Sequence, residues 1–187
     1  QMVTPPPVGP LACPGEYAPM DGVLIAWSAQ GNWPSTWRNI LNQMVARITT
    51  IAQARVYVAY ELDGDVAAAT AAFTAAGADL GKVSFVKANL DAIWIRDYGP
   101  RYVYEGDTRI IVDHVYNRPA RPNDDKFPIA FSSHKGHTLY ALPLVHGGGN
   151  YHLSTLGDSF STRLINNENN GNGDLYNYTE DQIHDLW

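Results

Sequence analysis

The sequence predicts an α/β fold, in which short buried strands alternate with helices. Three short apolar runs bounded by turn residues indicate buried strands: residues 22–27, 55–60 and 83–87. After the first run, Pro34 opens a segment whose apolar residues follow helical spacing from Trp37 to Ile51. After the second, an Ala-rich helix is expected over residues 65–76, ended by Gly77. This order of strands and helices is typical of α/β proteins.

Beyond residue 90, the predicted elements are shorter and are mostly strands. The expected strands are residues 93–95, 101–104, 109–115, 139–145 and 160–165. The turn residues Glu105, Gly106 and Asp107 join two of these strands into a hairpin. Residues 117–137 contain several prolines and charges and are expected to form a loop, and residues 166–174 are expected to form a polar loop that does not pack.

The two ends of the chain differ from its middle. Residues 1–20 are rich in proline, which disfavours a helix, so we expect them to form an extended strap over a body formed by residues 21–187. Near the other end, Thr179 and Gln182 match a helix capping box. The apolar stripe of that helix consists of Ile183, Leu186 and Trp187. Because a helix of two turns is marginal alone, the pattern predicts that more polypeptide belongs after residue 187.

Composition excludes several classes of protein. Of the 187 residues, 45% are hydrophobic, and no apolar run reaches the ~18 residues that indicate a transmembrane helix. The net charge of −6 argues against a nucleic-acid partner. Because Cys13 is the only cysteine, a disulfide framework and a Cys-based zinc cluster are excluded. His134 and His137 are interpreted as solvated, and no metal or cofactor is expected. Few charged residues and many Asn, Thr, Ser, Gly and Tyr favour a secreted or periplasmic protein.

The segment from Asp91 to Pro100 carries the strongest chemical signal. It places two carboxylates, one arginine and two aromatic residues at the end of a predicted strand, where α/β folds tend to position reactive groups. The alternative is structural, with Arg96 pairing with Asp97 or Asp91 to lock a turn.

Two further segments can bind a ligand. The glycines between His146 and Asn150 allow a backbone to approach a ligand closely, or else allow tight packing of strands. Arg118 and Arg121 are separated by prolines and suit capture of a carboxylate, the alternative being solvated arginines. A serine esterase that uses Ser159 is disfavoured because no G-x-S-x-G elbow is present.

Together these segments resemble the bacterial peptidylarginine deiminase and agmatine deiminase family, most closely its Porphyromonas type. The matching motifs are E-Y-x-P-M-x-G-V-L-I-x-W from Glu16, D-x-I-W-I-R-D-Y-G-P from Asp91, V-D-x-x-Y-N-R-P with R-P-N-D-D from Val112, G-G-N-Y from Gly148, and the Asn cluster at 166–170. The resemblance implies a guanidine-modifying enzyme of the pentein superfamily, a five-bladed α/β propeller. It also implies that residues 21–187 form the N-terminal part of that catalytic propeller, completed by polypeptide outside this chain.

The resemblance assigns roles residue by residue. Asp97 is the catalytic carboxylate that binds the substrate guanidinium, and Trp94 lines the substrate slot. Arg118 matches the arginine that holds the C-terminal carboxylate of a peptide, and Arg121 matches its companion if Ala120 counts as an insertion. The last substrate-binding residues that the motifs assign are Asn150 and Tyr151.

The implied reaction is hydrolytic deimination of peptidyl arginine to citrulline with release of ammonia. The nucleophilic cysteine, the catalytic histidine and a second guanidinium-binding aspartate lie further along the family's chains, and Cys13 does not match that cysteine. The expected partners are an arginine-containing peptide or a small guanidine, and the remainder of the protein as a separate chain or missing segment, with no nucleic acid and no membrane. Two alternatives stay open: an agmatine deiminase of putrescine biosynthesis, and a non-catalytic guanidinium-binding module. The agmatine enzymes have an acid before their glycine pair, whereas here the glycines follow His146 and Gly147, which argues against the first alternative and leaves the role of His146 open.

Overall fold

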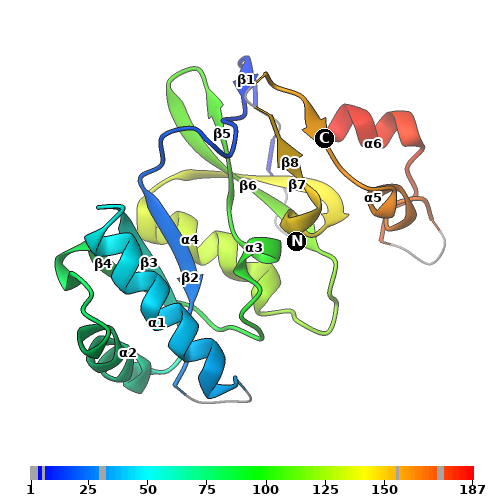
Figure 1. Cartoon of the computed structure of the whole chain (residues 1–187). Coiled ribbons are helices and arrows are strands. Elements are labelled where there is room, and N and C mark those ends of the chain that lie inside the picture. The colour runs from blue at the N-terminus through cyan, green and yellow to red at the C-terminus, as the bar shows by residue number, and fades with distance from the viewer. Residues whose placement is uncertain (1–3, 6, 30–32, 155, 172–174) are drawn as a thin grey trace. The chain divides into compact units, whose positions relative to one another are not determined.

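The fold was analysed in a computed structural model that describes residues 4–5, 7–29, 33–154, 156–171 and 175–187. The chain divides into two compact units (Figure 1). We call residues 19–95 the small unit, and residues 1–18 together with residues 96–187 the large unit. Each unit is described by itself.

The small unit is a parallel sheet with helical connections, which confirms the predicted alternation of strands and helices. Its strands are β2 (Gly22–Ala26), β3 (Arg55–Tyr60) and β4 (Val83–Lys87), in the order β2-β3-β4. The connections are α1 (Ser35–Thr50), α2 (Asp63–Ala75) and the short 3₁₀ helix η1 (Leu80–Lys82). Parallel strands require such crossovers, so the β-α-β-α-β order in the sequence was sufficient to predict this unit.

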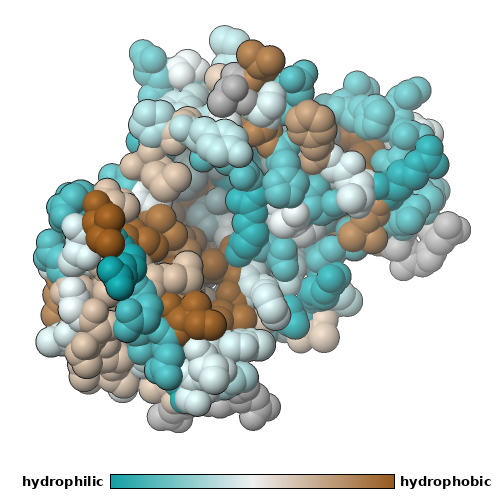
Figure 2. Space-filling model, viewed as in Figure 1, coloured by the Kyte–Doolittle hydropathy of each residue, from teal (hydrophilic) through white to brown (hydrophobic). Residues whose placement is uncertain are grey.

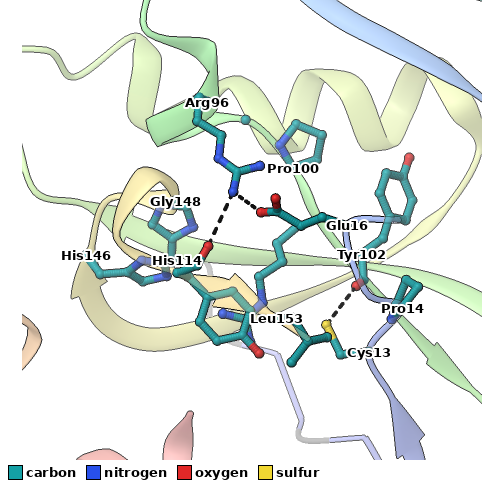
Figure 3. Close-up of a pocket in the computed structure, with 13 residues that line it drawn as sticks. Cys13, Pro14, Glu16, Arg96, Pro100, Tyr102, His114, His146, Gly148 and Leu153 are labelled. Atoms are coloured by element: carbon teal, nitrogen blue, oxygen red, sulfur yellow. Dashed lines mark hydrogen bonds and ion pairs between the residues drawn. The ribbon is translucent and has the colours of Figure 1, made fainter. Parts of the chain in front are cut away.

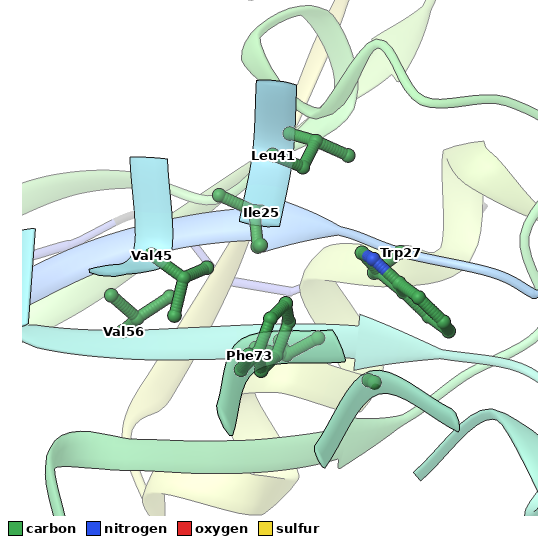
Figure 4. Packing of buried hydrophobic residues seen from close by; sticks show 8 residues of the cluster. Ile25, Trp27, Leu41, Val45, Val56 and Phe73 are labelled. Carbon is green, nitrogen blue, oxygen red and sulfur yellow. The ribbon is translucent and has the colours of Figure 1, made fainter. Parts of the chain in front are cut away.

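The core of the small unit lies between β3 and its two helices (Figure 4). Val45 of α1, Val56 of β3 and Phe73 of α2 are fully buried, and Trp27 packs edge-to-face on Phe73 with ring centroids 6.0 Å apart. Burying side chains of this size stabilises a fold by ~1.5–3 kcal/mol each. This cluster therefore anchors both helices to the sheet.

Helix α1 buries less of its apolar stripe than its sequence predicted. Leu41 and Val45 are buried and Ile48 packs partly against the core. The apolar side chains that stay exposed are Trp37, Ile40, Met44 and Ile51. Hydrophobic residues accordingly appear at the surface of the small unit (Figure 2). The spacing predicted the helix correctly but not how much of its stripe the unit covers.

The large unit is built on a mixed sheet. Within the described residues its order is β1-β5-β6-β7, formed by β1 (Leu11–Ala12), β5 (Arg101–Glu105), β6 (Thr108–Tyr116) and β7 (Thr138–His146). Strands β5 and β6 form the predicted antiparallel hairpin, whereas β6 and β7 are parallel. The remaining elements are η2 (Asp124–Lys126), α4 (Phe127–Lys135), η3 (Gly148–Asn150), β8 (His152–Leu153), β9 (Ser159–Phe160), α5 (Leu164–Asn167), α6 (Glu180–Leu186) and α3 (Ile95–Tyr98), which begins on the last residue of the small unit.

The described part of the N-terminal strap lies along the edge of this mixed sheet. Strand β1 pairs with β5, and the backbone N–H groups of Val8 and Gly9 donate to Glu105 Oε1 at 2.7 and 2.9 Å. These two hydrogen bonds hold the pKa of the Glu105 carboxyl below its usual range. The strap is thus tied to a residue far along the chain.

Three predicted elements are wrong. The expected strand 93–95 is a bend leading into the single turn α3, because Ile93 packs partly against the core of the small unit without pairing with a strand. The expected loop 117–137 contains α4, which starts at a proline-compatible position and ends at Gly136 with φ 66°. Of the expected strand 160–165, only Phe160 lies in a strand, β9, and its last residues, Leu164 and Ile165, begin α5.

The expected polar loop over residues 166–174 is packed at its start. Asn169 is fully buried, and its amide accepts from the N–H of Val145 and donates to the carbonyls of Val145 and Ile165, each at 2.8 Å. An asparagine can replace a strand neighbour in this way because its amide mimics a peptide group. The expectation of an unpacked loop is therefore wrong there, while residues 172–174 lie outside the described residues.

The helix predicted near residue 179 is confirmed. Thr179 and Gln182 form the expected reciprocal capping box of α6. Ile183 is buried in a cluster with Leu144 and Ile165, and Trp187 packs against that cluster. The apolar stripe of α6 therefore packs within the large unit.

The α/β class is confirmed, but a propeller is not seen. The described strands form open sheets that do not close on themselves in either unit. Among the described residues, none of the helices combines the length and apolarity needed to cross a membrane, and no group of three or more His, Cys, Asp or Glu side chains is placed to hold a metal ion.

Candidate functional site

Asp97 is presented by a short, well-anchored turn. The next residue, Tyr98, is buried, and its ring packs on Tyr116 and Phe127 with centroid distances of 5.7 and 5.9 Å. His114 Nε2 lies 3.0 Å from the backbone carbonyl of Asp97, where a protonated Nε2 donates to it. Since Tyr98 fills the core and His114 fixes the backbone, the half-buried side chain of Asp97 has a defined position.

The glycine loop after β7 packs directly against this turn. A Cβ on Gly148 would lie 2.5 Å from the carbonyl oxygen of Arg96, and a Cβ on Gly149 would lie 2.5 Å from Asp97 Oδ1. The contact at Gly148 is with backbone, so that position requires glycine, whereas a Cβ at Gly149 would displace the Asp97 carboxylate. The Gly149 N–H donates to Asp97 Oδ1 at 3.2 Å. The glycines thus allow close packing against α3, where the alternative interpretation proposed tight packing of strands, and they orient the carboxylate.

Asp97 keeps one carboxylate oxygen open. Arg96 pairs with Glu16 (Figure 3), so the expected Arg96–Asp97 ion pair is wrong. Among the described residues, Oδ2 of Asp97 has no hydrogen-bond partner, and it is not sealed from solvent. A carboxylate that is oriented by one backbone donor and has a free oxygen can accept hydrogen bonds from a planar cation.

Two buried histidines lie behind this turn. His114 of β6 and His146 of β7 stack with ring centroids 3.9 Å apart. Burial lowers the pKa of His114 to about 4, and burial together with the neighbouring His114 lowers that of His146 to about 2. Neither ring nitrogen of His146 has a well-formed hydrogen bond to a described residue, although the nearby Gly147 backbone partly offsets its lowered pKa. Both rings are therefore neutral near pH 7.

Strand β6 also carries a buried carboxyl group, directly before His114. Asp113 of β6 is only 4% exposed, and its Oδ1 has no hydrogen-bond partner among the described residues. Burial first, and the charge of Asp125 second, raise the pKa of Asp113 to about 7. Asp125 is itself held by the N–H of Tyr116 at 2.6 Å. Sequence reasoning missed Asp113 and the histidine pair because the strand pattern does not show which polar side chains face inward.

A cavity of about 220 Å³ lies beside the histidines in the large unit (Figure 3). Its lining includes Cys13, Glu16, Arg96, Arg101, His114 and His146. The Sγ of Cys13 donates to the carbonyl of Tyr102 at 3.6 Å, and the guanidinium of Arg101 lies 4.1 Å above the ring of Tyr151. Asp97 is not part of this lining, so this cavity does not bring Cys13 and the Asp97 carboxylate together.

The structure places Asn150 and Tyr151 as supports of the loop that carries Gly149. Asn150 Oδ1 accepts from the N–H and hydroxyl of Thr162 at 3.1 and 2.9 Å, and its Nδ2 donates to Ser161 at 3.2 Å. Tyr151 packs on Arg101. Their predicted contact with substrate stays a prediction.

The two predicted carboxylate-binding arginines differ in their freedom. Arg121 Nη1 donates to the hydroxyl of Tyr116 at 3.1 Å, so its guanidinium is held in place. Arg118 is exposed, and its guanidinium donates to the carbonyl of the preceding residue, Asn117, at 2.9 Å. Trp94 belongs to the small unit, where it is 48% exposed and packs edge-to-face on Trp37 with centroids 5.8 Å apart. Arg118 and Trp94 therefore both keep a face for a ligand.

Comparison with known proteins identifies the family. The family model of the Porphyromonas-type peptidyl-arginine deiminases matches residues 12–185. The chain belongs to this family. The resemblance that the motifs predicted is thereby confirmed, whereas a search of curated proteins gave no match.

Solved structures show the same fold. The chain is similar to an agmatine deiminase of C. jejuni, with a TM-score of 0.67, 17% identity, and coverage of 85% of this chain and 48% of that chain. It is similar to a provisionally assigned peptidyl-arginine deiminase, with a TM-score of 0.73, 18% identity, and 94% and 52% coverage. It is also similar to a provisionally assigned arginine deiminase from Porphyromonas gingivalis, with a TM-score of 0.68, 19% identity, and 94% and 53% coverage. The chain thus spans about half the length of these structures.

Proposed function

We propose that this chain forms the guanidinium-binding half of a hydrolase that converts peptidyl arginine to citrulline and ammonia. The observation that carries the proposal is the Asp97 carboxylate, with one oxygen bound to Gly149 and the other open. Family membership supports arginine or guanidine deiminase chemistry at this carboxylate.

The proposed role of Asp97 follows from the chemistry of the substrate. A guanidinium is planar and cationic, and its N–H groups match the oxygens of a carboxylate. Binding to Asp97 would fix the central carbon for attack. A cysteine thiolate then forms a bond to that carbon, a C–N bond breaks, and the nitrogen leaves as ammonia with a proton from a general acid. Water then adds to the carbon of the resulting S-alkylthiouronium and the C–S bond breaks, which releases citrulline and the thiol.

The nucleophile and the general acid are proposed to come from polypeptide outside this chain. Cys13 lies in the strap, and the cavity it lines does not include Asp97. His114 and His146 are buried with lowered pKa values, which makes both poor proton donors near pH 7. The similar solved structures are about twice as long as this chain, which is consistent with a second half that carries these groups. Export to the periplasm or the medium is also proposed, on composition alone.

The substrate is proposed to be a peptide with a C-terminal arginine. The exposed guanidinium of Arg118 can pair with a free carboxylate, while Arg121 is held by Tyr116 and forms a fixed second donor. Agmatine has no carboxylate, so this pair would not contribute to its binding. Replacement of Arg118 by alanine should weaken a peptide with a free carboxylate by about threefold to tenfold but leave its amide unaffected. Equal effects on both peptides would remove the carboxylate role.

The test of the central proposal is the substitution Asp97→Asn, which keeps an oxygen for Gly149 but removes the charge. Loss of a charge-assisted hydrogen-bond pair should weaken binding of an arginine-terminated peptide by about tenfold to a hundredfold, measured by calorimetry. Asp107→Asn, in the exposed β5–β6 turn, is the matched control. In preparations that also contain the remainder of the protein, the same substitution should abolish citrulline formation. Normal turnover by Asp97→Asn would refute the assignment, and binding without any turnover in the wild type would favour a non-catalytic module.

A further inference from the structure

Arg96 and Asp97 are neighbours of opposite charge on the same turn. Arg96 is therefore a potential competitor for the Asp97 carboxylate. Adjacent residues on a helix point about 100° apart, but an arginine stem is long and flexible. A Cβ on Gly149 would lie 2.5 Å from Asp97 Oδ1 and 4.0 Å from Arg96 Cγ, so both side chains pass the same glycine. An Arg96 guanidinium that turned toward Asp97 would fill the position proposed for the substrate.

The guanidinium of Arg96 is held elsewhere. Its Nη2 donates to Glu16 Oε1, and also to the carbonyl of Tyr151 at 3.3 Å. Figure 3 shows the Arg96 and Glu16 side chains pointing toward one another. The hydrogen bond from Arg96 is the main cause that lowers the pKa of Glu16, so this group stays a carboxylate at neutral pH. His152 Nδ1 lies 3.7 Å from the same Glu16 oxygen, where a protonated ring would add to the pair.

The position of Glu16 depends on the strap. Strand β1 pairs with β5 just before Cys13, and Cys13 bonds to the carbonyl of Tyr102. These contacts hold the segment before Glu16 against β5, the strand that directly follows α3 in the sequence. The strap therefore delivers one carboxylate to Arg96 from a distant part of the sequence.

We propose that Glu16 is a positioning residue that holds the Arg96 guanidinium away from Asp97 and so keeps the Asp97 carboxylate open for a substrate guanidinium. The inference rests on the proposed function of Asp97. It adds that guanidinium recognition depends on the strap, through an ion pair that makes no contact with the substrate.

The size of the effect follows from exposure. The side chains of Arg96 and Glu16 are 58% and 41% exposed, so water and salt screen their attraction. Exposed pairs of this kind alter an equilibrium by about twofold to fivefold. Removing the Glu16 charge should therefore weaken guanidinium binding by about that factor, and the difference should shrink in 1 M salt, where screening acts within about 3 Å.

The experiment compares Glu16→Gln, the double variant Glu16→Gln/Arg96→Met and the control Glu105→Gln in the full chain. Glu105 also binds the strap, through Val8 and Gly9, and glutamine keeps an oxygen that accepts from both N–H groups, so the control removes a strap-binding charge without releasing Arg96. The probe is N-acetyl-arginine amide, and its dissociation constant is measured by calorimetry. We expect Glu16→Gln to bind about twofold to fivefold more weakly, the double variant to regain most of that loss, and Glu105→Gln to match the wild type.

A crystal structure of Glu16→Gln separates this inference from the proposed function. Loss of local negative charge alone would leave Arg96 in place, whereas the inference requires its guanidinium to contact Asp97. If Arg96 stays away from Asp97, or if the double variant binds no better than Glu16→Gln, the inference is overturned while the role of Asp97 stands. If the wild type shows no binding that depends on Asp97, the proposed function fails. In that case Arg96 contacting Asp97 in the variant would still establish the holding role of Glu16.

Discussion

Replacement of the buried Asp113 by asparagine should stabilise the protein, and only above a certain pH. The carboxyl is 4% exposed, its Oδ1 has no hydrogen-bond partner among the described residues, and its pKa is raised to about 7. In the unfolded chain the same group titrates near its ordinary value of 3.8. Between these two values the native state holds a proton that the unfolded state has released. Stability contributed by the protonated form is therefore complete below pH ~4 and is lost as the pH rises toward 7.

The magnitude follows from the separation of the two pKa values. Each pH unit between them costs ~1.4 kcal/mol of unfolding free energy, so the full loss above pH 7 amounts to ~4 kcal/mol as an upper bound. Asparagine has nearly the same shape but carries no charge. Asp113→Asn should therefore be more stable than the wild type by ~2–4 kcal/mol at pH 8 and nearly equal to it at pH 4.

Urea denaturation at a series of pH values between 4 and 8 measures this difference directly. Asp125→Asn is the companion variant, since the Asp125 charge is the second cause of the raised pKa. It should give a smaller gain because it also weakens the acceptor for the N–H of Tyr116. A difference between Asp113→Asn and the wild type that is the same at all pH values would show that Asp113 titrates normally and would refute the reasoning.

Two further predictions concern the histidine pair and the glycine loop. The pKa of His146 is lowered in the native state, so as the pH falls the unfolded state takes up a proton that the native state does not. His146→Gln should therefore reduce the loss of stability on acidification by ~1.4 kcal/mol per pH unit between pH 6.5 and 4 in the same denaturation series. An unchanged dependence of stability on pH in this range would show that this ring is not held neutral. Gly149→Ala should weaken guanidinium binding by about tenfold or more in calorimetry, because its Cβ would collide with Asp97 Oδ1. The control Gly64→Ala, whose Cβ meets no atom within 4 Å, should have no effect. Normal binding by Gly149→Ala would show that the loop moves easily.

Elements with strong local patterns were predictable, and elements defined by distant contacts were not. The parallel sheet of the small unit and the capped helix α6 follow from hydrophobic spacing and from Thr179 and Gln182. Helix α4 was missed although Pro128 and Gly136 are ordinary start and stop signals, because nearby prolines and charges suggested a loop. Burial of Asn169 depends on β7, which no local pattern in the Asn-rich segment reveals.

The same limit applies to the candidate site. Family motifs identified Asp97 and the glycines that follow His146, and the structure brings these two segments together. The Glu16–Arg96 pair and the stacking of His114 on His146 join segments far apart in the sequence. Neither follows from spacing along the chain. A partner for Arg96 was expected among its immediate neighbours, but the strap supplies it.

The arrangement of the chain into units has a consequence for how the protein folds. The small unit is a single continuous segment inserted between the two pieces of the large unit, so all of its contacts are available as soon as residues 19–95 have been synthesised. The large unit instead needs the N–H groups of Val8 and Gly9 to find Glu105, which closes a loop of almost a hundred residues. Closing a loop of this length slows assembly. The effective length of the loop is shorter when the inserted segment is already compact. Pulse-labelling hydrogen exchange should accordingly show amides of β3 protected before those of β1.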